Sequence, residues 1–257
     1  MSTHQNWVAG RLLLFALVVA ASIAAGQDRS TQGSGSSPAL DQLKMGFGAM
    51  GEGLYEEALD HYAAALEHAN TRELRFQALL GLGSAEAALD RLEDARKSYE
   101  QALDIKPDSP EALFSTGMVA KDQGDFDAAA ELFAKAAVRR PDFAEALTQL
   151  GVVYAIAGRH DEAAASCRRA VSVNPQDVEA LLCLGVAMYH LGRYGDATVP
   201  FDAVIAIDPA NSRARYSLGL CKLMLGNTRG AAAEYKALEE LDPDLARDLF
   251  DRIQERR

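Results

Sequence analysis

The stretch GFGAMG, from Gly46 to Gly51, matches the G-x-G-x-x-G pattern of dinucleotide-binding loops. Such a loop needs a β-strand before it and a helix that begins at it. No strand-like run precedes Gly46, and the apolar residues around it have helical spacing. We therefore expect no cofactor site here. We interpret Gly46, Gly48 and Gly51 as residues that weaken a helix, each by about 1 kcal/mol relative to alanine.

Cysteine and histidine residues are the other candidates for chemistry. Cys183 and His190 are two helical turns apart, about 10 Å, which is too far for both to bind one metal ion. The three cysteines, Cys167, Cys183 and Cys221, leave at least one unpaired, and we expect no structural disulfide. The sequence also contains no phosphate loop, nucleophile elbow or zinc-protease motif. We therefore predict no cofactor, no metal ion and no enzymatic activity.

The composition is that of a folded protein, with 49% apolar and 25% charged residues in a chain of 257. The formal net charge is −11, and no cluster of Lys and Arg offsets it. Because a polyanion would be repelled by this net charge, we expect no nucleic-acid partner.

Residues 1–26 have the pattern of a secretory signal peptide: one basic residue, Arg11, an apolar run over residues 12–25, and small residues at its end. This run of 14 residues is shorter than the roughly 20 that a membrane-spanning helix needs. We expect an exported protein, periplasmic or secreted; the alternative is an uncleaved N-terminal helix that anchors the chain to a membrane. Residues 27–38 are rich in Gly and Ser and are predicted to form a flexible linker.

From Ala39 onward the sequence repeats with a period of 34 residues. The six units are residues 39–75, 76–109, 110–143, 144–177, 178–211 and 212–245, and only the first is longer, by three residues. We number positions from the first residue of each unit. Position 8 is always glycine: Gly46, Gly83, Gly117, Gly151, Gly185 and Gly219. Position 20 is always alanine: Ala58, Ala95, Ala129, Ala163, Ala197 and Ala231. Position 24 is aromatic in every unit but the fourth: Tyr62, Tyr99, Phe133, Cys167, Phe201 and Tyr235.

Each unit predicts two helices joined by a turn. Positions 4, 7, 8 and 11 form one face of the first helix, which ends at a left-handed residue such as Gly158 at position 15. The second helix ends before a proline such as Pro175 at position 32. The small residues at positions 8 and 20 let the two helices approach closely, while the aromatic residue at position 24 fills the space beside them. Because one hairpin cannot bury both its faces, the units must stack into a solenoid.

The period and these signature positions resemble the tetratricopeptide repeat family over residues 39–245. The resemblance implies an all-α fold: a right-handed superhelical solenoid of six 34-residue helix-turn-helix repeats. A C-terminal cap helix follows and includes residues 246–257, with Leu245, Leu249 and Ile253 on one apolar stripe. We expect the first repeat, with its glycines and no N-terminal neighbour, to be the least stable.

In this family the first helices line a concave groove, and ligands usually contact positions 2, 5, 9, 12 and 13. The apolar residues at these positions predict a partner-binding groove made by Leu80, Phe114, Met118, Val152, Ile156, Leu182, Val186, Tyr189, Tyr216, Leu220 and Leu223. Position 2 predicts an acidic rim made by Glu111, Glu145 and Glu179. The alternatives are that tight superhelical coiling buries the apolar residues, and that the glutamates only offset the charge of helix N-termini. Family members that clamp a chaperone's C-terminal carboxylate use Lys, Arg and Asn at such positions, which are missing here.

The sequence thus predicts a non-catalytic scaffold that binds a protein partner, as a peptide or a helix, in an apolar concave groove. We expect no small-molecule substrate. A first alternative is a structural subunit or assembly factor of a membrane-associated or oligomeric complex. A second is an accessory domain of an enzyme whose catalytic subunit is a separate chain.

Overall fold

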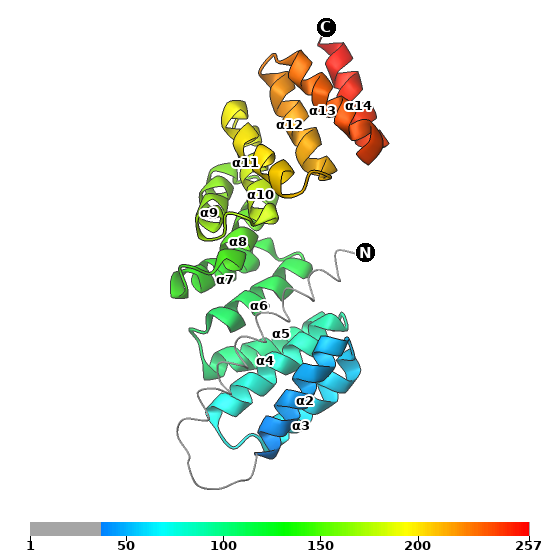
Figure 1. Cartoon of the computed structure of the whole chain (residues 1–257). Helices are drawn as coiled ribbons and strands as arrows, with labels where there is room; N and C mark the ends of the chain where they lie inside the picture. Colours follow the sequence, from blue (N-terminus) through cyan, green and yellow to red (C-terminus); the bar gives the residue numbers. More distant parts are fainter. Residues whose placement is uncertain (1–36, 257) are drawn as a thin grey trace. The chain divides into compact units, whose positions relative to one another are not determined.

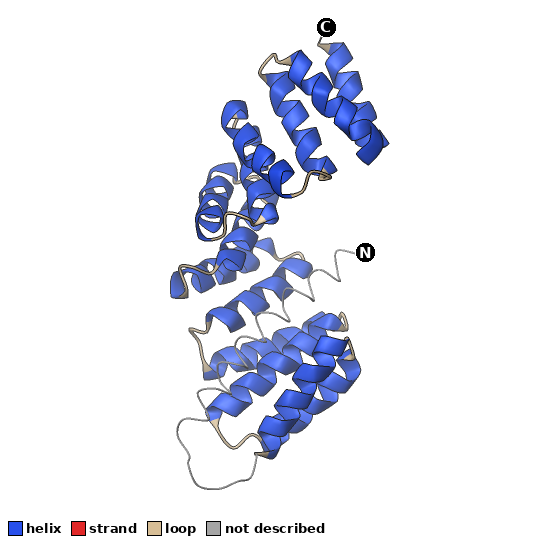
Figure 2. Cartoon of the chain, viewed as in Figure 1, coloured by secondary structure: helices blue, strands red, loops and turns tan. Residues whose placement is uncertain are grey.

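The structure, a computed structural model, describes residues 37–256 (Figure 1). The described residues form helices and short turns and include no strand (Figure 2), so the predicted all-α fold is confirmed. The predicted signal segment and all but the last two residues of the predicted linker lie outside the described range. The helices are α2 (Pro38–Glu52), α3 (Tyr55–His68), α4 (Arg72–Ala88), α5 (Leu92–Ile105), α6 (Pro110–Asp122), α7 (Phe126–Arg139), α8 (Ala144–Ile156), α9 (His160–Val173), α10 (Val178–His190), α11 (Tyr194–Ile207), α12 (Ser212–Met224), α13 (Thr228–Leu241) and α14 (Pro243–Glu255).

The described helices belong to two compact units, with the boundary after Arg139. In unit 1, helices α2 and α3, α4 and α5, and α6 and α7 form hairpins, and each second helix packs on the next first helix within the unit. Unit 2 has the same organisation, with α8 and α9, α10 and α11, and α12 and α13 as hairpins, followed by α14. These hairpins are the helix-turn-helix elements that the period of the sequence predicts.

The two helices of a hairpin interlock through positions 8 and 24. A Cβ atom added to Gly185 would lie 2.6 Å from the ring of Phe201, and one added to Gly83 would lie 2.8 Å from the ring of Tyr99. Carbon atoms in contact are normally about 3.5–4.0 Å apart, so no larger residue fits at these glycines without displacing the ring. Phe201 and Tyr99 are fully buried. The invariant glycine therefore makes room for the large side chain of the second helix.

The first helix of a hairpin ends at a left-handed residue. Gly158 has φ 73°, as predicted, but the second repeat has Asp90 at the same position, with φ 61°. Among the described residues Asp90 is the one non-glycine residue with positive φ. This conformation costs an L-residue roughly 1–2 kcal/mol of stability, and the cost is smallest for Asp and Asn. The second repeat therefore keeps the same turn geometry as the others but is less stable at this position than it would be with glycine.

The three extra residues of the first unit lengthen the helix that follows. Helix α4 begins at Arg72, four residues before the start of the second unit, and Thr71 caps it by accepting a hydrogen bond from the Leu74 amide (3.2 Å). Arg72 donates to the Ile105 carbonyl oxygen (3.0 Å) at the end of α5. The insertion thus adds one turn to α4, and this turn is held by the C-terminus of the neighbouring helix.

Helix α14 packs against the last hairpin. Leu249 and Ile253 of the predicted apolar stripe are buried, and Leu245 is half-buried. Leu249 fills the space at Gly219, where an added Cβ atom would lie 2.5 Å from its Cδ2 atom. The cap helix therefore supplies the side chain that the position-24 residue supplies in the other repeats.

Cys167 and Cys183 form a disulfide, with their Cα atoms 6.2 Å apart. The expectation of no structural disulfide is therefore wrong. The reason lies in the stacking, because a position-24 side chain also packs on position 6 of the next repeat, as Tyr62 does on Gly81. In the fourth and fifth repeats these two positions are the two cysteines. Cys221 is a buried free thiol, and burial raises its pKa to about 11.

The glycines of α2 differ in what surrounds them, which yields a paired test. An added Cβ atom meets nothing within 4 Å at Gly48, whereas at Gly46 it lies 2.9 Å from the ring of Tyr62. We expect Gly48→Ala to raise the free energy of unfolding by about 0.5–1 kcal/mol, because alanine favours the helix. We expect Gly46→Ala to lower it by about 1–3 kcal/mol through overpacking. Urea unfolding of the two variants measures both values, and equal signs would contradict this account of the interlock.

Candidate functional site

The predicted groove residues of unit 2 lie in a row across three neighbouring first helices, α8, α10 and α12. We call this row the unit 2 stripe; it consists of Val152, Ile156, Leu182, Val186, Tyr189, Tyr216 and Leu220. Ile156 is 56% exposed and Val186 is 37% exposed, and the other members are half-buried. Five members, Val152, Leu182, Tyr189, Tyr216 and Leu220, pack on the buried clusters of unit 2. The stripe is thus a set of partly exposed apolar side chains, most of which are attached to the core of unit 2.

Four other predicted groove residues are buried. Leu80, Phe114 and Met118 of unit 1 are 3%, 7% and 4% exposed, and the ring of Phe114 lies 5.6 Å from that of Phe133. Leu223 of unit 2 is also buried and packs with residues of α13 and α14. For these four residues the structure agrees with the alternative interpretation, in which the apolar residues at the groove positions are buried. The partly exposed members of the predicted groove are those of the unit 2 stripe.

Tyr216, at one end of the stripe, is held by helix α14. Its hydroxyl donates a hydrogen bond to the Asp248 carboxylate, which also accepts from Arg252 Nε (2.6 Å). Burial and the hydrogen bond to Asp248 raise the pKa of Tyr216 to about 12. Arg252, and after it Tyr216, hold the pKa of Asp248 below its usual range. The Tyr216 ring is therefore neutral and fixed in orientation at neutral pH.

Tyr189, at the C-terminus of α10, belongs to a cluster of aromatic rings. Its ring lies 5.2 Å from that of Tyr194 and 5.7 Å from that of His190, which stacks on His160 at 4.5 Å. Burial raises the pKa of Tyr189. His160 and Tyr194 were not predicted, because the groove was predicted from residues of the first helices alone. Both stand at position 17, which begins the second helix, and this shared position is the signal that could have found them.

The glutamates of the predicted acidic rim stand in the first turns of α6, α8 and α10. Glu111 accepts a hydrogen bond from the Ser109 hydroxyl (2.8 Å), and Glu179 accepts one from Gln149 Nε2 (3.1 Å). Carboxylates in a first turn are stabilised by the helix dipole. Glu145 and Glu179 are exposed beside the unit 2 stripe, so they also give that edge of the stripe a negative charge.

The described part of the chain has no group of three or more His, Cys, Asp or Glu side chains arranged to hold a metal ion. Cys183, one of the two residues weighed as metal ligands, is in the disulfide. Among residues 37–256 no helix is long and apolar enough to cross a membrane.

Comparison with known proteins identifies the family. The family model of the tetratricopeptide repeat matches residues 43–110, 114–172, 168–212 and 200–246. The chain belongs to the tetratricopeptide repeat family. Among solved structures of this kind, YrrB, described as a TPR protein with an unusual peptide-binding site, has a TM-score of 0.67 at 23% identity and covers 74% of this chain and 97% of its own. MamA has a TM-score of 0.61 at 25% identity and covers 65% of this chain and 97% of its own.

A curated relative of this tetratricopeptide repeat protein is the photosystem I assembly protein Ycf3 of Rippkaea orientalis (strain PCC 8801 / RF-1). The two are 31% identical over 99 residues, which are 36% of this chain and 57% of that relative. The chain thus spans little more than half the length of Ycf3.

The hydrogen bond between Tyr216 and Asp248 has a consequence for titration. In Asp248→Asn the negative charge is lost, so we expect the pKa of Tyr216 to fall below about 12 while burial keeps it above its usual value. NMR titration of carbon-labelled tyrosine measures the shift. Tyr235, whose hydroxyl is bound by Glu239 instead, should keep its pKa and serves as the internal control. An unchanged Tyr216 titration would mean that Asp248 does not hold this hydroxyl in solution.

Proposed function

We propose that this tetratricopeptide repeat protein is a non-catalytic scaffold that binds a peptide segment or partner helix along the unit 2 stripe. The observation that carries the proposal is the partial exposure of seven apolar or aromatic side chains on three neighbouring first helices, with Val152, Val186 and Leu220 at the same repeat position on each. Contiguous exposed apolar surface on a soluble protein usually marks a binding site. An amphipathic helix that lays its apolar face into a groove between helices is a recurring mode of recognition.

The negative charge next to the unit 2 stripe indicates which charge the partner carries. Glu145 and Glu179 are exposed at the N-terminal ends of α8 and α10, on one edge of the apolar row. A partner with basic residues beside its apolar face would complement this edge. The edge supports a basic and apolar segment as the ligand, in agreement with the net negative charge of the chain.

A second candidate function is assembly. The relative Ycf3 is named as an assembly protein of photosystem I, and its similarity covers 36% of this chain. We infer from it that the scaffold could act on the subunits of a larger complex while that complex forms. Light scattering distinguishes an assembly factor from a structural subunit. A monomer at all concentrations supports a scaffold or assembly factor, and a defined oligomer supports a structural subunit.

We further propose that the protein is exported. The apolar run over residues 12–25 supports export, and the disulfide between Cys167 and Cys183 supports it independently, because disulfides persist in oxidising compartments. An uncleaved N-terminal segment would leave the scaffold attached to the membrane surface instead. In either case the repeats would lie on the oxidising side.

The stripe is tested by a pair of aspartate variants on α10. Val186 is 37% exposed and Leu184 is 7% exposed. We expect Val186→Asp to reduce capture of a crosslinked partner at least about tenfold, because an apolar ligand would desolvate the new carboxylate without pairing it. Its melting temperature should stay within a few degrees of the wild type. Leu184→Asp should unfold the repeat.

Two outcomes would contradict the proposal. If Val186→Asp destabilises the fold as much as Leu184→Asp, the stripe belongs to the core. If Val186→Asp changes neither stability nor capture, the partner docks on another surface. Circular dichroism melting of each variant, measured before the capture experiment, distinguishes the two.

Export is tested by counting free thiols in protein taken directly from cells under acid quench. An exported chain should offer one free thiol after denaturation, that of Cys221, and three after reduction. A chain that stays in a reducing compartment should offer three without reduction. N-terminal sequencing of the same sample distinguishes a cleaved signal peptide from an anchor.

A further inference from the structure

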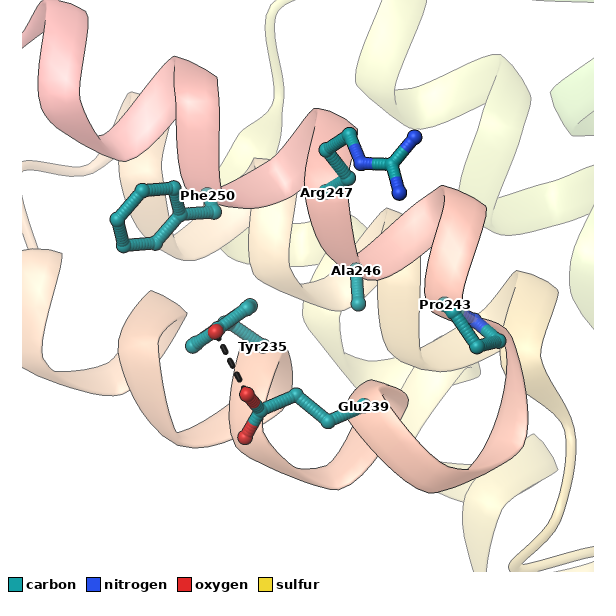
Figure 3. A pocket seen from close by; sticks show the side chains of 6 residues that line it. All are labelled: Tyr235, Glu239, Pro243, Ala246, Arg247 and Phe250. Carbon is teal, nitrogen blue, oxygen red and sulfur yellow. Dashed lines mark hydrogen bonds between the residues drawn. The ribbon is translucent and has the colours of Figure 1, made fainter.

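A hollow of about 310 Å³ lies between helices α13 and α14 (Figure 3), and no residue of the unit 2 stripe lines it. It is lined by Tyr235, Glu239, Pro243, Ala246, Arg247 and Phe250. The rings of Tyr235 and Phe250 lie 5.3 Å apart and are tilted by 42°, and Phe250 is 40% exposed. Sites for small molecules are typically about 300–1,000 Å³, so this hollow is of a size for one long side chain.

The hollow is open because the last repeat ends differently from the others. The position-24 side chains of the first five repeats are fully buried, whereas Tyr235 is half-buried. Asp242 alone separates α13 from α14 and caps the latter through the Leu245 amide (3.1 Å), while residues 208–211 separate α11 from α12. This short connection lets Leu249 fill the space at Gly219. Tyr235 packs on Phe250 instead, and the packing of the repeats leaves these two rings partly uncovered.

The hollow is lined by one carboxylate, that of Glu239, and one guanidinium, that of Arg247. The Tyr235 hydroxyl donates to Glu239 Oε1 (2.7 Å), which holds the carboxylate beside the Tyr235 hydroxyl (Figure 3). A carboxylate accepts about four hydrogen bonds, so Glu239 keeps acceptor capacity for a ligand. The guanidinium of Arg247 points away from the rings (Figure 3), and Asp244 and Asp251 stand three residues before and four after it, on the same face of α14. The charge that faces the rings is therefore that of Glu239.

We propose that this hollow binds the guanidinium group of an arginine side chain from a partner protein. Guanidinium is planar, stacks on aromatic faces and forms paired hydrogen bonds with a carboxylate. Tyr235 and Phe250 supply the aromatic faces, and Glu239 supplies the carboxylate. The exposed acidic residues nearby, Glu240 and Asp244, favour a basic ligand by their charge. This site is separate from the unit 2 stripe and does not rest on the function proposed for it.

The probe for this site is the blocked tripeptide acetyl-Gly-Arg-Gly-amide, titrated into the purified full-length protein and followed by NMR. We expect saturable shifts of the Tyr235 and Phe250 ring signals and of backbone amides in α13 and α14. The same peptide with Lys in place of Arg should bind several-fold more weakly, because ammonium neither stacks nor pairs as a plane. The peptide with Glu should produce no saturable shift.

Two conservative variants locate the binding. Phe250→Leu and Glu239→Gln should each weaken the arginine peptide about fivefold or more, since they remove one aromatic face and one negative charge. Glu240→Gln removes an adjacent exposed charge that does not line the hollow. The fold-change in affinity that it causes should be less than half of the fold-change caused by Glu239→Gln. Melting temperatures within a few degrees of the wild type confirm that each variant is folded.

Equal binding of the arginine and glutamate peptides would overturn the proposal, as would arginine-induced shifts that persist unchanged in Phe250→Leu. Shifts of the same signals on raising the protein concentration without peptide would show instead that a second copy of the chain covers the hollow.

Discussion

In the first, second, third and fifth repeats the second helix places an aromatic ring where a Cβ atom of the first helix would be, as Phe201 does at Gly185. This contact requires a residue without a side chain at one position and bulk at another, sixteen residues later. It brings the two helices close together and fixes their register along each other. The position-24 side chain also reaches position 6 of the next repeat where Tyr62 touches Gly81 and where Cys167 bonds to Cys183, and there it joins neighbouring hairpins as well. Hairpin geometry and stacking therefore depend on one set of contacts.

This interlock determines which surfaces remain for function. The face of each first helix that carries position 8 is committed to the core, so any ligand must meet the opposite face or an end of the array. The unit 2 stripe is such an opposite face, and the hollow at Tyr235 is such an end. Both expose apolar side chains whose inner sides are packed, which holds them in place before a partner arrives and lowers the entropic cost of binding.

Much of the fold could be predicted because a repeated pattern averages out local exceptions. Glycine at position 15 and proline at position 32 marked the helix ends, and the structure places them there at Gly158 and Pro175. Burial along the groove could not be predicted, since position 5 holds an apolar side chain both where it is buried, at Phe114, and where it is half-exposed, at Leu182. What separates the two is the packing of neighbouring helices, which position within the repeat does not encode.

Contacts between neighbouring repeats were the second feature that could not be predicted from the sequence. The cysteine pair was missed because alignment of units compares each position with its counterpart and does not pair position 24 with position 6 of the following unit. The partial exposure of Tyr235 was not predicted for a related reason. Asp242 ends α13 as its counterparts end the other second helices, but the next helix, α14, begins at Pro243, directly after it. In both cases the local sequence matched the family and the neighbouring segment decided the outcome.

The disulfide affects local unfolding of the hairpins in unit 2. An array in which each repeat touches only its neighbours frays from its ends, one hairpin at a time, because each interface can open alone. The bond between Cys167 and Cys183 joins α9 of one hairpin to α10 of the next. Those two hairpins stay covalently joined when the interface between them opens, so the unfolded chain has less conformational freedom and this interface is stabilised. Most of the unit 2 stripe stands on the first helices of these two hairpins, so the bond stabilises the part of unit 2 that carries the proposed binding surface.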